Sequence, residues 1–462
     1  MRGIGGVFLA AAVTHRDRSS TAPTGLIQEE GPDRWGFARQ TEETTQTMKS
    51  PIRLVGLLAT LTLVASACGP SGSAPTTGAT QPAATQGEAS TGPAALSGSL
   101  TIWEAYGASG TSEKDAFDKI VGQIKAANSG LTVNVLDVPF NDLFNKFETS
   151  ASTGEPDMYI APNDSLPSEA RNGLLADVSD LEATLKGAPY NTSDVALNAA
   201  MVDGKLYEIP ESMKAVELFY RTDQLATAPA TTADWMTNAA KLGLVYGANG
   251  GGAYYEWGWY STFGGKIMDD TGKCAATQGG VADALKFLAD FKAAGGHLYQ
   301  NDGDAKADLI SGKIGGFIDG PWQSGDLKTA LKDKLAVAAG PTGPSGGTWA
   351  PMTAPDGFYI NAASPNIDLA KQFALQFLLP ANEQVFADAG HLPANTTLQP
   401  SDAIAQAFAA LMPSGFARPT LAALNNYWGN FGSAIVAVVD KKTDATTEVA
   451  NACSAMDKAN KL

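Results

Sequence analysis

The chain has 462 residues and a formal net charge of −16 at pH 7, because 48 acidic side chains outnumber 32 basic ones. Phosphate backbones are bound by basic surfaces, so this balance argues against nucleic acid as a partner. Hydrophobic residues make up 44% of the chain and include eight tryptophans, which is ample for the packed cores of two domains of ordinary size.

The segment that ends at Cys68 has the features of a secretory signal. Lys49 and Arg53 stand before a short apolar run over 54–64, and small residues come directly before the cysteine. This is the order of a secretory signal peptide, and the run is too short for a bilayer core that needs about 20 residues. A cysteine at this place resembles the lipobox of bacterial lipoproteins, although Ala65 replaces its usual leucine. We expect an exported protein that lipid on Cys68 holds at the extracytoplasmic face of the cell membrane. An ordinary secretory signal with a chance cysteine is the alternative.

On this interpretation, three N-terminal segments do not belong to the folded part of the protein. Residues 1–47 carry charges ahead of the signal, so we interpret Met48 as the true start and the preceding residues as an upstream translation artefact. Residues 48–67 form the lipoprotein signal peptide. Residues 68–98 are rich in Ser, Thr, Pro, Gly and Ala; they offer too little apolar surface for folding and are expected to form a flexible linker.

Two cysteines, Cys274 and Cys453, remain once Cys68 carries lipid. Cysteines in an oxidising compartment are paired more often than free. A bridge between these two would close a loop of about 180 residues and constrain the unfolded chain strongly. Two buried thiols are the alternative.

Helix-like and strand-like patterns alternate along the rest of the chain. Short runs or alternations of apolar residues predict strands at 99–103, 131–136 and 158–160. Apolar residues at helical spacing predict helices at 115–127, 169–175, 281–294, 367–379 and 402–411. This order predicts an α/β protein with a parallel or mixed sheet and helices on both of its faces.

Residue types that carry catalysis or bind metal are sparse. His297 and His391 lie in separate segments without Cys or carboxylate neighbours at metal-ligand spacing, and we interpret both as surface or loop histidines. Residues 343–347 match the letters of G-x-S-x-G, but they lack the strand and helix that this motif needs, so a surface turn is expected. Residues 301–304 lack the other ligands of a calcium loop and suit the cap of a helix that begins near Ala305. We therefore predict no catalytic residue, no metal and no cofactor.

Aromatic residues beside glycine and proline form the most informative pattern of the folded part. Five rings fall within 254–260, Trp322 and Trp349 follow Gly- or Pro-containing segments, and Trp428 precedes a glycine. Rings in such places are expected at the ends of elements, where side chains point into clefts. A pyranose stacks its C–H face on such rings, each contact contributing on the order of 1 kcal/mol, and offers its hydroxyls to carboxylates and amides. The pattern predicts sugar binding, with Trp257 and Trp349 among the candidates; core packing is the alternative.

Four motifs stand in order along the part of the chain beyond the linker. They are PDMYIAPND with NGLLA (156–164, 172–176), DGKLYEIP with LFYRTD (203–210, 218–223), GK with DGPW (312–313, 319–322), and INAASPN (360–366). Together they resemble the extracellular solute-binding proteins of ABC sugar importers, and within that family the maltose- and maltodextrin-binding branch. Each motif is weak alone, but the ordered set behind a lipobox and a linker is specific.

The resemblance implies a periplasmic-binding-protein-like fold, in which two α/β lobes are joined by crossing strands and the ligand lies in the cleft between them. We expect the first lobe at 99–214 and 357–402 and the second at 215–356 and 403–462. Cys274 and Cys453 then fall in the same lobe, which favours a disulfide between them.

The resemblance also implies roles for individual residues. Trp322, Trp428 and Tyr254 match positions whose rings stack on sugar in the second lobe. Asp164 matches a first-lobe carboxylate that bonds sugar hydroxyls.

Two positions depart from the pattern of the best-known maltose binders. Ala161 stands where they have a stacking tryptophan, and Lys214 stands where they have a glutamate. Lys214 is still able to donate to hydroxyls. Glu104, Asn163 and Glu211 are further candidates, because polar groups at the ends of strands face the cleft in sheets of this kind.

The expected function is that of a monomeric, lipid-anchored binding protein. It would capture a maltose- or maltodextrin-type oligosaccharide by hinge closure and deliver it to the permease subunits of an ABC transporter, without catalysis. The first alternative is another solute, such as trehalose, a cyclodextrin, a different oligosaccharide, or glycerol phosphate if Lys214 meets an anion. A second is a secreted glycoside hydrolase, which needs two carboxylates about 5 to 10 Å apart across the sugar. A third is a surface adhesin that binds no small ligand.

Overall fold

The computed structural model describes residues 95–107, 111–248 and 250–462, which belong to one compact unit. The expected signal peptide, Cys68 and nearly all of the expected linker lie outside these residues. Among the helices of the described ranges, none is both long and apolar enough to cross a membrane.

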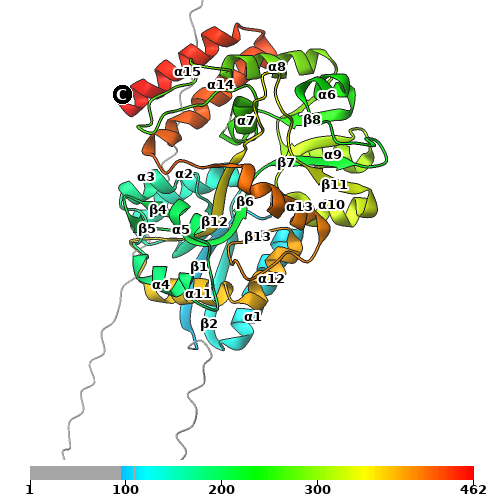
Figure 1. The fold of residues 1–462 in the computed structure, drawn as a ribbon. Helices are drawn as coiled ribbons and strands as arrows, with labels where there is room; N and C mark the ends of the chain where they lie inside the picture. Colours follow the sequence, from blue (N-terminus) through cyan, green and yellow to red (C-terminus); the bar gives the residue numbers. More distant parts are fainter. Residues whose placement is uncertain (1–94, 108–110, 249) are drawn as a thin grey trace, which may run out of the picture. The chain divides into compact units, whose positions relative to one another are not determined.

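A mixed sheet of seven strands forms the lower half of the view in Figure 1 and has the order β13-β6-β12-β3-β1-β2, with β14 beside β12. Its strands are β1 (Ser97–Glu104), β2 (Gly130–Asp137), β3 (Met158–Pro162), β6 (Ile209–Lys214), β12 (Met352–Ile360), β13 (Leu392–Pro393) and β14 (Phe416–Ala417). β1 is parallel to β2 and β3, whereas β12 is antiparallel to β3 and β6. We call this sheet and its helices the first lobe.

Side chains of the first sheet alternate between two apolar cores, as the period of two in a strand requires. Leu100 and Ile102 belong to one core, and Trp103 belongs to the other; Ile160 and Tyr159 divide in the same way. Three helices packed on the first core are α1 (Thr111–Ala127), α11 (Ile367–Phe377) and α12 (Pro380–Ala389), with the shorter α4 (Glu182–Lys186) and α5 (Asp194–Ala199). Two helices on the second core are α2 (Phe140–Ser150) and α3 (Leu166–Arg171).

A second sheet has the order β11-β7-β10-β8-β9. Its strands are β7 (Glu217–Arg221), β8 (Leu242–Val245), β9 (His297–Tyr299), β10 (Gly316–Asp319) and β11 (Leu335–Ala338). One continuous apolar core joins it to α6 (Thr232–Thr237), α7 (Gly250–Thr262), α8 (Val281–Ala293), α9 (Asp302–Ser311), α10 (Ser324–Leu331), α13 (Ala403–Leu411), α14 (Asn425–Lys441) and α15 (Ala445–Asn460). We call this sheet and its helices the second lobe. A small separate ribbon pairs β4 (Met201–Val202) with β5 (Lys205–Leu206).

The chain passes between the two sheets more than once. β6 of the first sheet leads into β7 of the second after two residues, and β11 of the second sheet precedes β12 of the first. The last part of the chain pairs β14 with the start of β12 before it enters α14. The predicted α/β fold with two lobes and crossing strands is confirmed.

One predicted helix is displaced along the chain. The expected helix at 169–175 is α3, which begins earlier, with a proline in its first turn, and ends at Arg171. Gly173 follows with a φ of +70°, a left-handed conformation that ends helices and that glycine adopts without strain.

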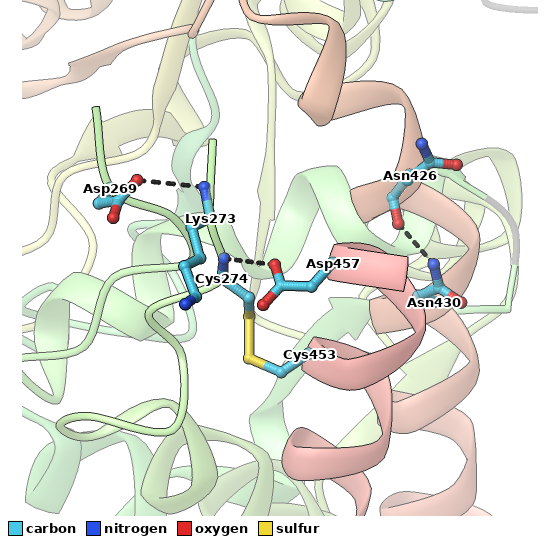
Figure 2. The surroundings of a disulfide bond; sticks show 7 residues. All are labelled: Asp269, Lys273, Cys274, Asn426, Asn430, Cys453 and Asp457. Carbon is cyan, nitrogen blue, oxygen red and sulfur yellow. Dashed lines mark hydrogen bonds between the residues drawn. A yellow bond between two sulfur atoms is a disulfide. The ribbon is translucent and has the colours of Figure 1, made fainter. Parts of the chain in front are cut away.

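The structure joins Cys274 to Cys453 in a disulfide across 179 residues of sequence (Figure 2). Cys453 lies in α15, and Cys274 lies in the segment between α7 and α8. Next to the bridge, the backbone N–H of Cys274 donates to Asp457 Oδ1 at 2.7 Å. The bond ties the C-terminal helix to the interior of the second lobe.

Removal of this disulfide is expected to destabilise the fold. Replacing both cysteines by alanine releases a long loop in the unfolded chain, and in the chain-entropy model the free energy of unfolding falls by up to about 5 kcal/mol. Urea unfolding of the wild type, both single variants and the double variant measures the loss. If the bond is the cause, each single variant loses nearly as much as the double variant; additive small losses would contradict the pairing.

Three buried glutamates in different elements stay protonated at pH values at which an exposed glutamate has lost its proton. Glu169 of α3, Glu217 of β7 and Glu383 of α12 are at most 2% exposed. Burial disfavours the charged carboxylate, and it raises the pKa of each to about 8. These acids are therefore neutral in the folded protein over a range in which they ionise in the unfolded chain.

The free energy of unfolding is expected to fall as the pH rises from about 5 to about 8. A raised folded-state pKa means that the folded protein binds more protons than the unfolded chain between the two pKa values, so stability is lost over that window. We expect a loss of at least about 1.4 kcal/mol, the value of one pKa unit on one group. Urea unfolding at pH 5, 6, 7 and 8 measures it. In Glu217→Gln, which stays neutral, the decline should be shallower, and an unchanged or rising profile in the wild type would contradict the assignment.

Candidate functional site

A cavity of about 630 Å³ lies between the two lobes. Its first-lobe wall is made by the segments that follow β1, β2 and β3 and by the crossing strands β6 and β12. Its second-lobe wall is made by the segments after β8, β9 and β10, the start of α7 and the start of α14. Ligands of α/β proteins bind at the carboxyl ends of such strands, so the fold itself places this cavity where a ligand is expected.

Four aromatic residues, Tyr254, Tyr255, Trp322 and Trp428, line the second-lobe wall. Tyr254 and Trp322 have ring centroids 6.3 Å apart, and Trp428 lies on α14 beside the same cavity. The hydroxyl of Tyr254 and Nε1 of Trp428 are buried and have no hydrogen-bond partner in the described protein. A buried polar group without a partner is costly. A ligand that stacks on the rings and bonds these two atoms would remove that cost.

Lys214 and Asp356 stand on the two neighbouring crossing strands. Lys214 Nζ lies 2.7 Å from Asp356 Oδ1 and 5.4 Å from the centroid of the Trp322 ring. Both residues line the cavity, and so does Ala161 at the end of β3. The ammonium is therefore held between a carboxylate of the neighbouring crossing strand and a ring of the second lobe, with polar hydrogens at the cavity surface.

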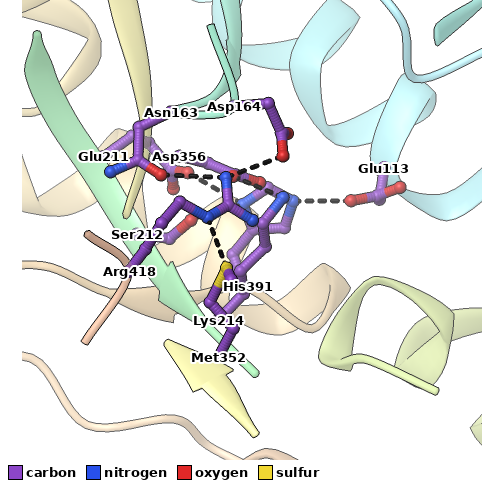
Figure 3. A network of polar contacts seen from close by, with 10 residues as sticks. All are labelled: Glu113, Asn163, Asp164, Glu211, Ser212, Lys214, Met352, Asp356, His391 and Arg418. Carbon is purple, nitrogen blue, oxygen red and sulfur yellow. Dashed lines mark hydrogen bonds and ion pairs between the residues drawn. The ribbon is translucent and has the colours of Figure 1, made fainter. Parts of the chain in front are cut away.

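Asp164 pairs with Arg418, a residue that the sequence analysis did not single out. Arg418 Nη1 lies 2.9 Å from Asp164 Oδ1, and it also donates to Asn163 Oδ1 at 2.9 Å. Figure 3 shows the guanidinium between these side chains and Met352, whose sulfur accepts from Nε. Both Asp164 and Arg418 line the cavity.

Behind the first-lobe wall, His391 lies between two carboxylates (Figure 3). Its Nε2 is 2.8 Å from Glu113 Oε1, and its Nδ1 is 2.8 Å from Glu211 Oε2. Burial alone lowers the pKa of His391, but the two carboxylates outweigh burial and raise it to about 10. The ring is thus protonated at neutral pH, donates from both nitrogens, and orients the cavity-lining Glu113. The expectation of a surface or loop histidine is right about the loop, since His391 lies between α12 and β13, but wrong about the surface, since the residue is only 4% exposed. Its partners are distant in sequence.

Three predicted polar residues lie behind the cavity rather than on its lining. Glu104 is fully buried and accepts from the backbone N–H of Tyr106 at 2.6 Å. Asn163 donates to the carbonyl of Ala199 at 3.1 Å and accepts from Arg418. Glu211 is held by His391, as described above. In each case at least one side-chain polar atom bonds the protein itself, so these residues support the lining groups.

Two predicted tryptophans also lie off the lining, in the core of the second lobe. Trp257 packs edge-on against Tyr427, with centroids 5.1 Å apart. Trp349 is 4% exposed, and its Nε1 donates to the carbonyl of Val216 at 3.3 Å. Apolar packing explains both positions.

The structure thus brings Tyr254, Trp322, Trp428, Asp164 and Lys214 together at one cavity. Sequence reasoning missed further lining residues, which include Tyr106, Glu113, Phe144, Asp302, Asp356, Arg418 and Asn425. The strand-end rule that selected Glu104 would have found Tyr106 two residues later. In the described ranges, no group of three or more His, Cys, Asp or Glu side chains is arranged to hold a metal ion.

Comparison with known proteins gives relatives along most of the folded part. Maltodextrin-binding protein MdxE of Bacillus subtilis is 25% identical over 264 residues, which cover 52% of this chain and 61% of that protein. The chain spans about three fifths of the length of the maltodextrin- and maltooligosaccharide-binding relatives that it matches. A galactooligosaccharide-binding protein of the same organism is 24% identical over 377 residues, which cover 75% of this chain and 85% of that protein.

Among solved structures, the maltotriose-binding protein of Thermus thermophilus, bound with maltotriose, has the same fold. It superposes with a TM-score of 0.71 at 23% identity and covers 78% of this chain and 100% of that one. The resemblance inferred from the ordered motifs is confirmed. Residues 119–412 match the family described as bacterial extracellular solute-binding protein, and the chain belongs to that family.

Proposed function

We propose that the protein captures a maltodextrin-type oligosaccharide outside the cytoplasmic membrane and delivers it to the permease of an ABC transporter. Lipid on Cys68 would hold it at the extracytoplasmic face. The part of the expected linker that precedes β1, which begins at Ser97, would separate the anchor from the folded part. The protein would act as a monomer and would carry out no chemistry of its own, since ATP is hydrolysed by another subunit of the transporter.

The observation that carries this proposal is the aromatic wall of the cavity with its unpartnered polar atoms. Tyr254, Trp322 and Trp428 offer ring surface to the C–H faces of pyranose units. The buried Tyr254 hydroxyl and Trp428 Nε1 lack protein partners and suit the hydroxyls at the sugar's edge. On the opposite wall Asp164 and Lys214 provide an acceptor and a donor. A ligand with alternating apolar faces and hydroxyl rims matches both walls.

The proposed mechanism is hinge closure about the crossing strands. The ligand contacts groups of both lobes only when they are close together, so it binds the closed form more tightly and shifts the population toward it. We propose hinge boundaries that leave 99–214 and 357–402 in the first lobe and 215–356 and 403–462 in the second. The permease would recognise the surface that only the closed form presents.

Another oligosaccharide is the second candidate ligand. Ala161 at the cavity gives no stacking ring. A relative that covers 75% of this chain binds galactooligosaccharide by its name. The available groups therefore fit a pyranose chain without fixing its linkage or its length.

Calorimetric titration of the full chain tests the proposal. Maltose, maltotriose, trehalose, a cyclodextrin, a galactooligosaccharide and glycerol phosphate form the panel. Saturable one-to-one binding of an α-glucan supports the proposed ligand, and preference for the galactooligosaccharide or for glycerol phosphate moves the function to the alternatives. Release of glucose from maltotriose during incubation would contradict a binding protein without catalysis.

Trp322→Ala is expected to weaken binding of the best ligand by about 2 kcal/mol or more, as truncation of a central aromatic contact does. The matched control is Trp322→Phe, which keeps a stacking ring and should retain most of the affinity. Circular dichroism and urea unfolding should show that both variants fold like the wild type. Equal affinity in wild type and Trp322→Ala would remove this ring from the site.

A further inference from the structure

Arg418 lies where the cavity meets the crossing strands. It directly follows β14, and its backbone N–H donates to the carbonyl of Thr353 in β12 at 2.9 Å. The residue lines the cavity but is only 3% exposed. A buried guanidinium stays charged and needs partners for its fork of donors. Its partners therefore show which parts of the molecule it connects.

In the first lobe, Arg418 is bonded to the turn that follows β3. Its Nη1 donates to Asn163 Oδ1 and Asp164 Oδ1, each at 2.9 Å. The Asp164 side chain is 20% exposed, so its carboxylate remains at the cavity surface while Arg418 fixes its orientation. An ion pair reinforced by a hydrogen bond to a neighbouring amide is a strong and directional contact.

In the second lobe, the same guanidinium lies over two of the cavity rings. Its central carbon is 5.4 Å from the centroid of Tyr254 and 5.5 Å from that of Trp428. A guanidinium is attracted to the faces of aromatic rings at such distances. Tyr254 belongs to α7 and Trp428 to α14, so Arg418 touches two separate elements of this lobe and the carboxylate of the other.

We propose that Arg418 is a positioning residue that joins the two walls of the cavity, favours the closed form, and holds Asp164, Tyr254 and Trp428 in the arrangement that the ligand meets. The consequence for sugar affinity rests on the proposed function, whereas the joining of the lobes does not. Arginine suits this role better than lysine, because its planar fork reaches two oxygens while its face lies on rings.

The consequence is measurable as a distance between the lobes. Val195 on α5 is 61% exposed, and the Lys286 side chain on α8 is 66% exposed, so both positions accept a spin label on an introduced cysteine. The full chain carries Cys68→Ser, and the native disulfide is left intact. Double electron–electron resonance then gives the distribution of distances between α5 and α8 without sugar and with saturating maltotriose.

The comparison uses the wild type, Arg418→Met and Arg418→Lys. With saturating maltotriose, a short distance between the two labels should dominate. Without sugar, part of the wild-type population should already show this short distance, whereas Arg418→Met should not. The affinity of Arg418→Met for maltotriose should be weaker by about tenfold or more. Apparent affinity falls in proportion to the fraction of the protein that is in the binding-competent form. Arg418→Lys keeps the charge beside Asp164 and should fall between the two.

The matched control is Arg221→Met, which removes a second arginine whose ion pair and carbonyl contacts stay within one lobe. Arg221 pairs with Asp223 at 2.9 Å and donates to the carbonyls of Leu309 and Ile310. This variant should lower the free energy of unfolding and leave the distances unchanged. If Arg418→Met does not fold, Asp164→Asn removes the charge on the other side of the pair and should shift the sugar-free distances in the same direction.

Identical sugar-free distance distributions in wild type and Arg418→Met overturn the proposal, whatever the affinity. The same holds if Arg418→Met changes only the free energy of unfolding, as a purely structural residue would. A wild type that binds no sugar of the panel would refute the proposed function instead, and the sugar-free distances would still test the role of Arg418.

Discussion

The antiparallel pairing of β6 with β12 is the interaction on which the site depends. Both strands belong to the first sheet, yet each continues into the second lobe. A register shift between Asp356 and Gly357 interrupts their pairing, and such a bulge redirects the side chain beside it. A Cβ at Gly357 would stand 2.4 Å from the carbonyl oxygen of Ile209, so only glycine allows this close approach. Asp356 lies beside this bulge at the cavity, with its carboxylate within ion-pair distance of Lys214.

Each cation at or behind the cavity has a carboxylate partner from the protein. Lys214 pairs with Asp356, Arg418 with Asp164, and His391 with Glu113 and Glu211. A phosphate or carboxylate ligand would have to compete with these carboxylates at close range, where like charges repel. Hydroxyl groups donate and accept without disturbing the pairs. The balance of charge therefore favours an uncharged ligand, and it weakens the idea that Lys214 receives glycerol phosphate.

Sequence patterns predicted the two-lobed fold and the aromatic residues of the site. The pattern of a ring near glycine, however, selected both cavity residues and core residues. A Cβ at Gly340 would lie 2.2 Å from the Trp349 indole, and one at Gly258 would lie 2.6 Å from it. Gly340 and Gly258 are apart from Trp349 in the sequence and make room for it in the core, whereas a Cβ at Gly320 would lie 2.0 Å from Trp322 at the cavity. A glycine that precedes a ring in the sequence therefore does not show whether that ring lies in the core or at a cavity, since the glycines packed on the ring are identified only by the folded structure.

The charged residues were harder to predict, since their partners are far away in sequence. His391 contacts a carboxylate 278 residues earlier, and Arg418 contacts Asn163 across 255 residues. A lone histidine or arginine carries no local signal of burial. Glu113, Glu211 and His391 all belong to the first lobe, so they move together when the lobes move. Arg418 instead contacts both walls, through Asp164 of the first lobe and the rings of Tyr254 and Trp428 of the second. Breaking these contacts when the lobes open would leave buried charges with fewer partners at a poorly hydrated place. The free energy of opening therefore depends strongly on the contacts of Arg418.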